Sequence, residues 1–141
     1  MQPHISMITL GVADIADATA FYERLGFTKS SQSQDAVTFM RAGAVVLGLF
    51  GREALKDDAN ADGIWTGNGG IAIAMNCADE TQVDTMLAQA EAAGARITKP
   101  AERVFWGGYS GYFADPDGHA WEVAHNPFWQ LDETGWIDLP A

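Results

Sequence analysis

Cysteine, basic residues and long apolar runs are all scarce in this chain of 141 residues. Cys77 is the single cysteine, so the chain can form no internal disulfide, Cys-X-X-Cys redox motif or cysteine-rich zinc site. No apolar run approaches the roughly 18 residues of a membrane span. The N-terminal residues MQPHISM lack the basic and apolar regions of a signal peptide. We therefore expect a cytoplasmic protein with no membrane partner.

The charge balance narrows the choice of partners. Lys and Arg number 8 against 19 Asp and Glu, which gives a formal net charge of −11. Proteins that bind nucleic acid neutralise its phosphates with clustered basic residues. Here the basic residues are few and spread along the chain, so we expect no nucleic-acid partner. Apolar residues make up 48% of the sequence, too many for a disordered chain, and the length predicts one folded domain.

The chain contains an internal repeat. Segments that begin at Met7 and Gly70 share the same order: an apolar strand, the dipeptide Ala-Asp, an amphipathic helix and a glycine. Asp14 and Asp79 match helix N-caps, because an aspartate side chain accepts hydrogen bonds from the free N–H groups of the first turn. The sequence therefore predicts two related modules.

Three strand-like runs follow each predicted helix. In the first half they span residues 27–32, 36–41 and 44–50, with a turn at Ala42-Gly43, and in the second half 95–102, 108–114 and 119–125. The last two runs are joined by the turn sequence Asp-Pro-Asp-Gly. The order βαβββ thus occurs twice, which predicts an α+β fold.

This order sets the expected domain organisation. Residues 1–141 form a single domain, with module 1 at about 4–50, a mobile linker at 51–69, module 2 at about 70–126 and a tail at 127–141. The tail sequence NPFWQLDETGWIDLPA is too apolar to remain free in water. We expect it to pack on the domain or on a second copy, which favours a homodimer.

A duplicated βαβββ unit ending in YFADPDGHAWEVAHNP resembles the glyoxalase/bleomycin-resistance/dioxygenase superfamily, also called vicinal oxygen chelate proteins. The resemblance extends from residue 4 to about residue 127 and includes the opening ISMITLGVADIADATAFYERLGF. It implies a curled mixed sheet around an open cleft, built within one chain or across a dimer. The superfamily contains metal lyases, dioxygenases, epoxide-opening resistance enzymes and drug-sequestering binders, so the resemblance does not fix a reaction.

The resemblance also implies where a metal would bind. Metal-dependent members carry His or Gln on the first strand, His at the start of the fifth and Glu on the eighth. The matching residues are Met7, Gly70 and Glu122, and the further Glu of glyoxalase I members would fall near Gly48 or Leu49. Divalent oxygen-chelating chemistry needs about three protein ligands. Glu122 alone survives, so we predict no metal and no other cofactor, and a divalent metal would require an atypical site.

Strand alternation identifies the residues that would line the cleft. Glu122 lies between Trp121 and Val123, so if the carboxylate faces the cleft, these two neighbours face the helices. A carboxylate between apolar residues is costly unless something pairs with it. With the resemblance, the predicted ligand-binding residues are Met7, Thr9, Phe50, Gly70, Trp106, Tyr109, Ser110, Tyr112 and Glu122.

Three functional interpretations remain. We favour a protein that binds or sequesters a compact neutral or cationic aromatic compound, with Glu122 as the central carboxylate and Tyr112 and Ser110 as its hydrogen-bond partners. The alternative is a lactoylglutathione-lyase-like or related lyase or dioxygenase-type enzyme. It would use an atypical metal site or metal-free acid/base chemistry, with Glu122 and Tyr112 as the catalytic residues. In the third, the fold has no ligand and serves as a dimeric structural protein.

Overall fold

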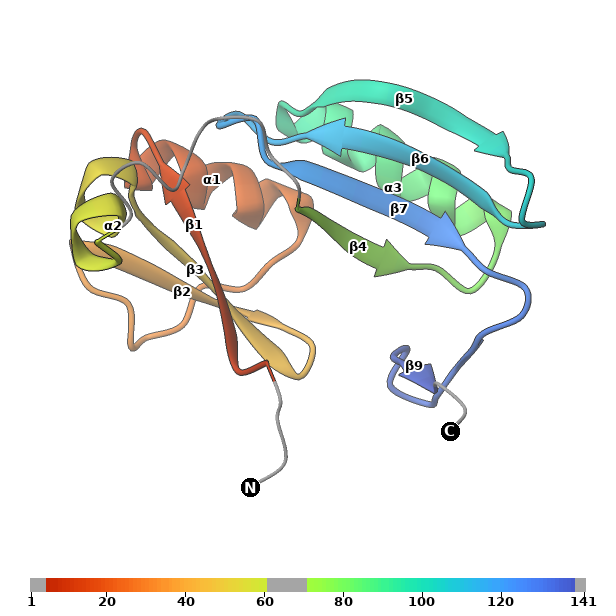
Figure 1. The fold of residues 1–141 in the computed structure, drawn as a ribbon, viewed down its shortest axis with the longest axis horizontal. Coiled ribbons are helices and arrows are strands. Elements are labelled where there is room, and N and C mark those ends of the chain that lie inside the picture. Colours follow the sequence, from red (N-terminus) through yellow and green to blue (C-terminus); the bar gives the residue numbers. More distant parts are fainter. Residues whose placement is uncertain (1–4, 61–70, 139–141) are drawn as a thin grey trace. The chain divides into compact units, whose positions relative to one another are not determined.

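The computed structural model describes residues 5–60 and 71–138 (Figure 1). Residue contacts divide the chain into two units, Met1–Gly70 and Ile71–Ala141. Each unit contains its own mixed β-sheet and a long helix that packs on one face of that sheet. The α+β fold class expected from the sequence is confirmed.

The first unit is built on a three-stranded sheet with the order β1-β3-β2. Its strands are β1 (Met7–Val12), β2 (Val37–Ala42) and β3 (Val45–Gly51). Strand β3 runs parallel to β1 and antiparallel to β2. The two-residue turn of the β2–β3 hairpin is Gly43-Ala44, one residue later than predicted, because Ala42 still pairs with Val45.

Helix α1 (Ile15–Leu25) covers one face of this sheet. Its predicted N-cap is confirmed, since the Asp14 side chain accepts a 2.8 Å hydrogen bond from the backbone N–H of Asp17. Apolar side chains at helical spacing face the sheet, and Phe21 and Tyr22 are fully buried. Within this core the hydroxyls of Thr19 and Thr38 hydrogen-bond to each other at 2.8 Å.

The strand predicted at residues 27–32 is reduced to an isolated bridge between Lys29 and Met40 on β2. The backbone leaves the sheet at Ser30, whose side-chain Oγ accepts from Gln32 N and whose carbonyl accepts from Ser33 N. Serine hydroxyls compete in this way with sheet hydrogen bonds, so a turn interrupts the strand.

Part of the predicted linker is helical. Residues Arg52–Asp58 form α2, which contacts β1 and β3. The sequence REALKDD consists largely of good helix formers, with Glu53 in the first turn and Lys56 in the last, each at the end that the helix dipole favours. The expectation of a mobile loop is therefore wrong for these seven residues. The rest of the expected linker, from residue 61, lies outside the described residues.

The second unit contains a four-stranded sheet with the order β4-β7-β6-β5. The strands are β4 (Ala72–Asn76), β5 (Arg96–Arg103), β6 (Tyr109–Ala114) and β7 (Ala120–His125). The unit's first strand, β4, lies parallel to its last, β7, just as β1 lies parallel to β3. The two units thus share one strand order. The isolated bridge of Lys29 to β2 occupies the position in the first sheet that β5 occupies in the second.

Helix α3 (Glu80–Ala93) packs on β5, β6 and β7. The predicted N-cap is confirmed and is part of a capping box: the Asp79 side chain accepts from Gln82 N at 2.8 Å, and Gln82 Oε1 accepts from Ala78 N at 2.9 Å. The predicted turn before β7 is also present, with Asp115 Oδ1 accepting from His119 N at 2.8 Å. These local hydrogen bonds fix where α3 and β7 begin.

The predicted tail folds into a short hairpin. Strands β8 (Gln130–Leu131) and β9 (Ile137–Asp138) pair antiparallel, and Asp132 closes the turn by accepting a 3.0 Å hydrogen bond from Trp136 N. Hydrogen bonds to this carboxylate, first from Thr134, hold the pKa of Asp132 below its ordinary value. In the described ranges, no helix has the length and apolar character needed to cross a membrane.

Candidate functional site

The sheet of the second unit has two distinct faces. The face toward α3 carries buried apolar side chains, among them Phe113 and Trp121, whose rings stack with centroids 6.0 Å apart and planes 2° apart. Val123 on the same strand is fully buried. Because side chains alternate along a strand, Tyr112 and Glu122 project from the opposite face, hereafter the open face. The predicted orientations of Trp121 and Val123 toward the helix are confirmed.

One row of four side chains crosses the open face. Ala74 on β4 pairs with Glu122 on β7, Glu122 pairs with Tyr112 on β6, and Tyr112 pairs with Lys99 on β5. Neighbouring strands lie about 4.8 Å apart, so a small organic molecule can reach several members of the row at once. The small side chain of Ala74 leaves the Glu122 carboxylate uncovered on that side.

Tyr112 and Glu122 are directly paired at the centre of the row. Burial raises the pKa of Tyr112, and the charge of Glu122 and then a hydrogen bond to its carboxylate raise it further. Both side chains are half-buried, so they remain accessible to a ligand.

Lys99 is a site residue that the sequence did not identify. It lies at the end of the row, and its charge lowers the pKa of Tyr112, against the larger effects that raise it. Its Nζ also forms a 3.2 Å ion pair with Glu102. Strand β5 shifts register on both sides of Lys99, and these irregularities hide the alternation that would have assigned its face.

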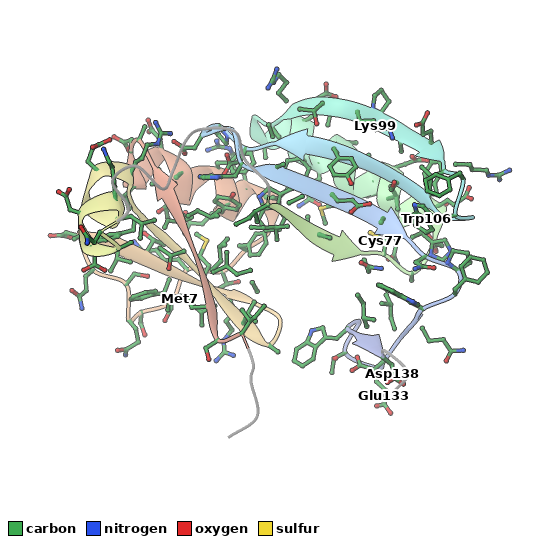
Figure 2. All side chains as sticks on the ribbon, in the orientation of Figure 1. Met7, Cys77, Lys99, Trp106, Glu133 and Asp138 are labelled. Carbon is green, nitrogen blue, oxygen red and sulfur yellow. The ribbon has the colours of Figure 1, made fainter. Side chains whose placement is uncertain are left out.

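Trp106 extends the open face toward the β5–β6 turn (Figure 2). Its ring lies over Gly108, where an added Cβ would be 1.8 Å from Cζ3 of the indole. Any larger residue at this position would require the indole ring to move. Trp106 keeps 36% of its surface exposed, so it offers an aromatic wall near Ser110, which faces the same way two residues along from Gly108.

Two predicted residues differ from expectation. Tyr109 projects toward α3, where its hydroxyl donates a 2.7 Å hydrogen bond to Asp84, so it does not share the open face with Tyr112. The reason is that regular pairing already begins at Tyr109, opposite His125. Ser110 does lie on the open face, but it is only 3% exposed and pairs with Ala124 rather than Glu122. Its predicted role as a partner of Glu122 is therefore not supported by the register.

The first unit brings together three of the predicted residues on the sheet face away from α1. Thr9 pairs with Gly48, and a Cβ at Gly48 would meet Thr9 Oγ1 at 3.3 Å and Met7 Sδ at 3.4 Å. Phe50 lies two residues along β3 from Gly48 and so shares this face. Gly70, the remaining predicted residue, lies outside the described residues.

The donor set does not fit a divalent metal site of the family type. Gly48 has no side chain, Met7 offers a soft thioether, and Glu122 supplies a single carboxylate. Oxygen-chelating divalent ions prefer carboxylate, imidazole and water ligands. Over residues 5–60 and 71–138, no three His, Cys, Asp or Glu side chains gather in a way that could hold a metal ion.

Comparisons with known proteins agree with this fold. A sequence model described as the Glyoxalase/Bleomycin resistance protein/Dioxygenase superfamily matches residues 4–123. The structure is similar to that of a glyoxalase-related enzyme from Fulvimarina pelagi, at 31% identity and a TM-score of 0.86, covering 99% of this chain and 100% of that one. A search of curated proteins found no match.

Two further solved structures share the fold at lower identity. A glyoxalase/bleomycin resistance protein/dioxygenase family enzyme from Burkholderia phytofirmans PsJN has 21% identity and a TM-score of 0.74, covering 85% of this chain and 96% of that one. A lactoylglutathione lyase from Agrobacterium tumefaciens has 24% identity and a TM-score of 0.67, covering 92% and 98%. At these identities the likeness concerns the fold alone.

Proposed function

Because the chain belongs to the glyoxalase/bleomycin resistance protein/dioxygenase superfamily, we propose that it binds a small organic molecule on the open face of the β4-β7-β6-β5 sheet. The observation that carries this proposal is the cross-strand pair of Tyr112 and Glu122, which is half-buried and lies beside the small side chain of Ala74. Small-molecule sites typically combine apolar walls with a few convergent polar groups. Tyr112 and Glu122 supply the polar groups, and Ala74 and Trp106 supply apolar surface.

The ligand chemistry follows from the charges along the row. Glu122 favours a cationic or hydrogen-bond-donating group, and Trp106 favours an aromatic ring. Lys99, on the other side of Tyr112, can pair with an acceptor on the same ligand. The net charge of −11 disfavours polyanions. A compact neutral or cationic aromatic compound fits these groups best. Met7, Thr9 and Phe50 are proposed as a second ligand-contacting surface on the first unit.

A thermal-shift screen tests this function. Aromatic amines and neutral aromatics should raise the melting temperature, since a ligand that binds only the folded state stabilises it. Calorimetry should then show weaker binding to Trp106→Ala, while Phe105→Ala, which removes the fully exposed ring of the neighbouring residue, serves as the matched control. If no compound stabilises the protein, or if both variants bind like the parent, the open face is not the binding site.

The second candidate function is an enzyme that uses acid/base chemistry without a metal. The pair supports it, because Glu122 can take a proton from a bound substrate and Tyr112 can donate one to it. In that case Glu122→Gln should abolish turnover of a compound that still binds. Retention of turnover in this variant would eliminate Glu122 as the base.

We also propose that the chain forms a homodimer in the cytoplasm. The C-terminal segment exposes several large apolar side chains, with Phe128 71% and Trp136 46% exposed in the single chain. Exposed apolar patches of this kind commonly mark protein interfaces. Sedimentation equilibrium should give twice the chain mass, and a Phe128→Ser/Trp136→Ser double variant should sediment as a monomer. A monomeric parent protein would refute the dimer.

A further inference from the structure

An ion pair on β5 lies on the same side of the sheet as Tyr112. In the register of β5 with β6, Lys99 pairs with Tyr112. Glu102 pairs with Ser110, which projects from the open face because it lies two residues from Tyr112. The Nζ of Lys99 is 3.2 Å from Oε1 of Glu102, so both β5 side chains lie on this face. The function proposed above leaves Glu102 without a role.

Opposite charges lie on the two sides of Tyr112. Glu122 on β7, Tyr112 on β6 and Lys99 on β5 are consecutive members of one row. Each step along the row is one strand spacing of about 4.8 Å. Burial raises the pKa of Tyr112 most, the charge of Glu122 raises it further, and the charge of Lys99 lowers it, so both charges reach the phenol. One end of the row therefore suits a cation and the other an anion.

Small side chains lie on both sides of this row along the strands. The neighbouring open-face pairs are Ser110 with Ala124 in one direction and Ala114 with Ala120 in the other. Serine and alanine side chains are shorter than those of tyrosine and glutamate, so they leave room above the sheet. A single aromatic ring can lie there against the phenol ring of Tyr112, in the offset or edge contact that aromatic pairs favour.

The ion pair of Lys99 and Glu102 can open for a ligand. The two side chains are 47% and 58% exposed, and exposed ion pairs contribute little to stability. The Lys99 ammonium has three N–H donors, so a ligand carboxylate can bind beside Glu102 or displace it. In both cases the negative charge of Glu102 opposes the carboxylate. Glu102 thus weakens the binding of anions at Lys99.

We propose that Lys99 and Glu102 select the ligand of the open face, a single-ring aromatic zwitterion with an ammonium and a carboxylate in para positions. This inference rests on the proposed function and narrows its neutral ligands to zwitterions. The ammonium binds Glu122, the ring packs on Tyr112 and the carboxylate binds Lys99. Because Glu102 competes for Lys99, a ligand with a carboxylate alone binds weakly, since it gains nothing at Glu122.

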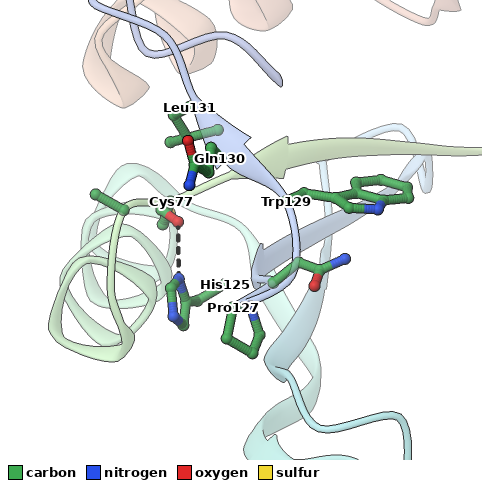
Figure 3. Close-up of a pocket in the computed structure, with 8 residues that line it drawn as sticks. Cys77, His125, Pro127, Trp129, Gln130 and Leu131 are labelled. Carbon is green, nitrogen blue, oxygen red and sulfur yellow. Dashed lines mark hydrogen bonds between the residues drawn. The ribbon is translucent and has the colours of Figure 1, made fainter. Parts of the chain in front are cut away.

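A pocket elsewhere in the second unit provides a control region for the test (Figure 3). Its volume is about 340 Å³, and its lining includes Cys77, His125 and Leu131 but none of the row residues Glu122, Tyr112 and Lys99. The dashed line in Figure 3 marks the 3.2 Å contact of His125 Nδ1 with the Cys77 carbonyl oxygen. The amides of His125 and Leu131 therefore report a ligand that binds there instead of on the open face.

Nitrogen-15 NMR titration at neutral pH tests the inference. The probe is 4-(aminomethyl)benzoate, and benzylamine and benzoate are its two halves. The zwitterion should shift the backbone amides of Tyr112 and Glu122 with a Kd of about 1 mM, the affinity expected for a ligand of this size. Each half should bind at least about threefold more weakly, because it lacks one of the two charge pairs. Equal binding of the zwitterion and benzylamine would overturn the inference and leave the open face as an amine site.

Three variants with exposed side chains identify the contacts. Lys99→Met should raise the Kd of the zwitterion at least about threefold without weakening benzylamine, since it removes the charge that binds the carboxylate. Glu102→Gln should lower the Kd of the zwitterion about two- to threefold, because it removes the competitor for Lys99. Arg103→Gln is the matched control, because Arg103 lies on the same strand but pairs with Glu80 of α3 at 3.3 Å.

The outcomes separate the inference from the proposed function. Unchanged binding of the zwitterion in Lys99→Met, unchanged or weaker binding in Glu102→Gln, or an equal loss in Arg103→Gln would each overturn the inference. Shifts of Tyr112 and Glu122 in these cases would still support the proposed function. If no compound shifts these two amides, or if shifts are confined to His125 and Leu131, the inference falls, and the thermal-shift screen decides the proposed function separately.

Discussion

Tyr112 and Glu122 lie directly opposite each other on β6 and β7, and the charge of Glu122 helps to raise the pKa of Tyr112 after the larger effect of burial. Cross-strand pairs of this kind are the closest side-chain neighbours in a sheet. The pair places a proton donor and an acceptor on the open face. The first two predictions concern these residues.

Glu122→Gln should weaken binding of a cationic ligand by about 1–3 kcal/mol, the scale of a charge-assisted hydrogen bond. The amide keeps the shape of the side chain, so the melting temperature should change little. Calorimetry with a ligand from the screen measures the effect. Glu91→Gln is the control, because that carboxylate is exposed on α3, on the other side of the sheet from the open face. Unchanged affinity with a collapse in melting temperature would mean that Glu122 is structural.

The ionisation of tyrosine provides a second test. The pKa of Tyr112 is raised by burial and by Glu122, and that of Tyr109 by its hydrogen bond to Asp84. Glu122→Gln should lower the pKa of Tyr112 alone, and Asp84→Asn that of Tyr109 alone. Absorbance of the phenolate against pH measures both effects.

The raised pKa values of the two tyrosines determine how the free energy of unfolding changes with pH. A tyrosine whose pKa is higher in the folded than in the unfolded protein stabilises the fold. This contribution is fully present below the unfolded pKa of about 10 and is lost as the pH rises through the folded pKa. Unfolding in urea from pH 8 to pH 12 should show this loss, and Glu122→Gln should reduce it. Identical pH dependence in the parent and this variant would contradict the Tyr112–Glu122 contact.

Metal content is the third prediction. Purified protein should contain well under one zinc, nickel, manganese or iron ion per chain, because Met7 and Gly70 are the residues at positions where the resemblance implies metal ligands. Elemental analysis after dialysis measures it. A stoichiometric ion that is lost on Glu122→Ala would show that the chain has an atypical metal site.

The fourth prediction concerns Gly111. A Cβ there would lie 2.7 Å from Leu87 Cδ1 and 2.9 Å from the backbone of Lys99 and Ala101. Gly111→Ala should therefore destabilise the protein by about 1–3 kcal/mol, the cost of overpacking. Gly51→Ala is the control, because its nearest atom is 3.8 Å away and its φ is −55°. Equal stability of both variants by urea unfolding would contradict the close packing of β5 on β6.

The sequence predicted the parts of the fold that depend on local signals. Asp14 and Asp79 determine where both long helices begin, and alternation on β7 assigns Trp121 and Glu122 to opposite faces. Prediction failed for α2, because its helix-forming residues are followed by a polar stretch that dominates the composition of the segment. The average composition of residues 51–69 therefore predicted a loop, although the first part of this segment contains a seven-residue helix.

Prediction of the site failed where strands are irregular or begin abruptly. Lys99 lies between two register shifts, so counting along β5 cannot assign its face. Tyr109 was expected among the ligand-binding residues, yet the regular pairing of β6 turns it to the face opposite Tyr112, where it bonds to Asp84. Such details depend on which backbone groups pair, and a single sequence does not contain that information.

The position of β1 and β4 at the edge of their sheets has a consequence for the order of folding. The hairpin β2–β3 and the meander β5–β6–β7 join neighbours in the chain, whereas Met7 pairs with Val46 and Ala72 with Ala120 only after a long loop closes. Loop closure costs entropy before the distant contacts form, so the edge strands should dock last and detach first. In native-state hydrogen exchange, amides that bond β1 to β3 and β4 to β7 should then open at lower free energy than those within the hairpins. Equal protection would mean that each sheet opens as one unit.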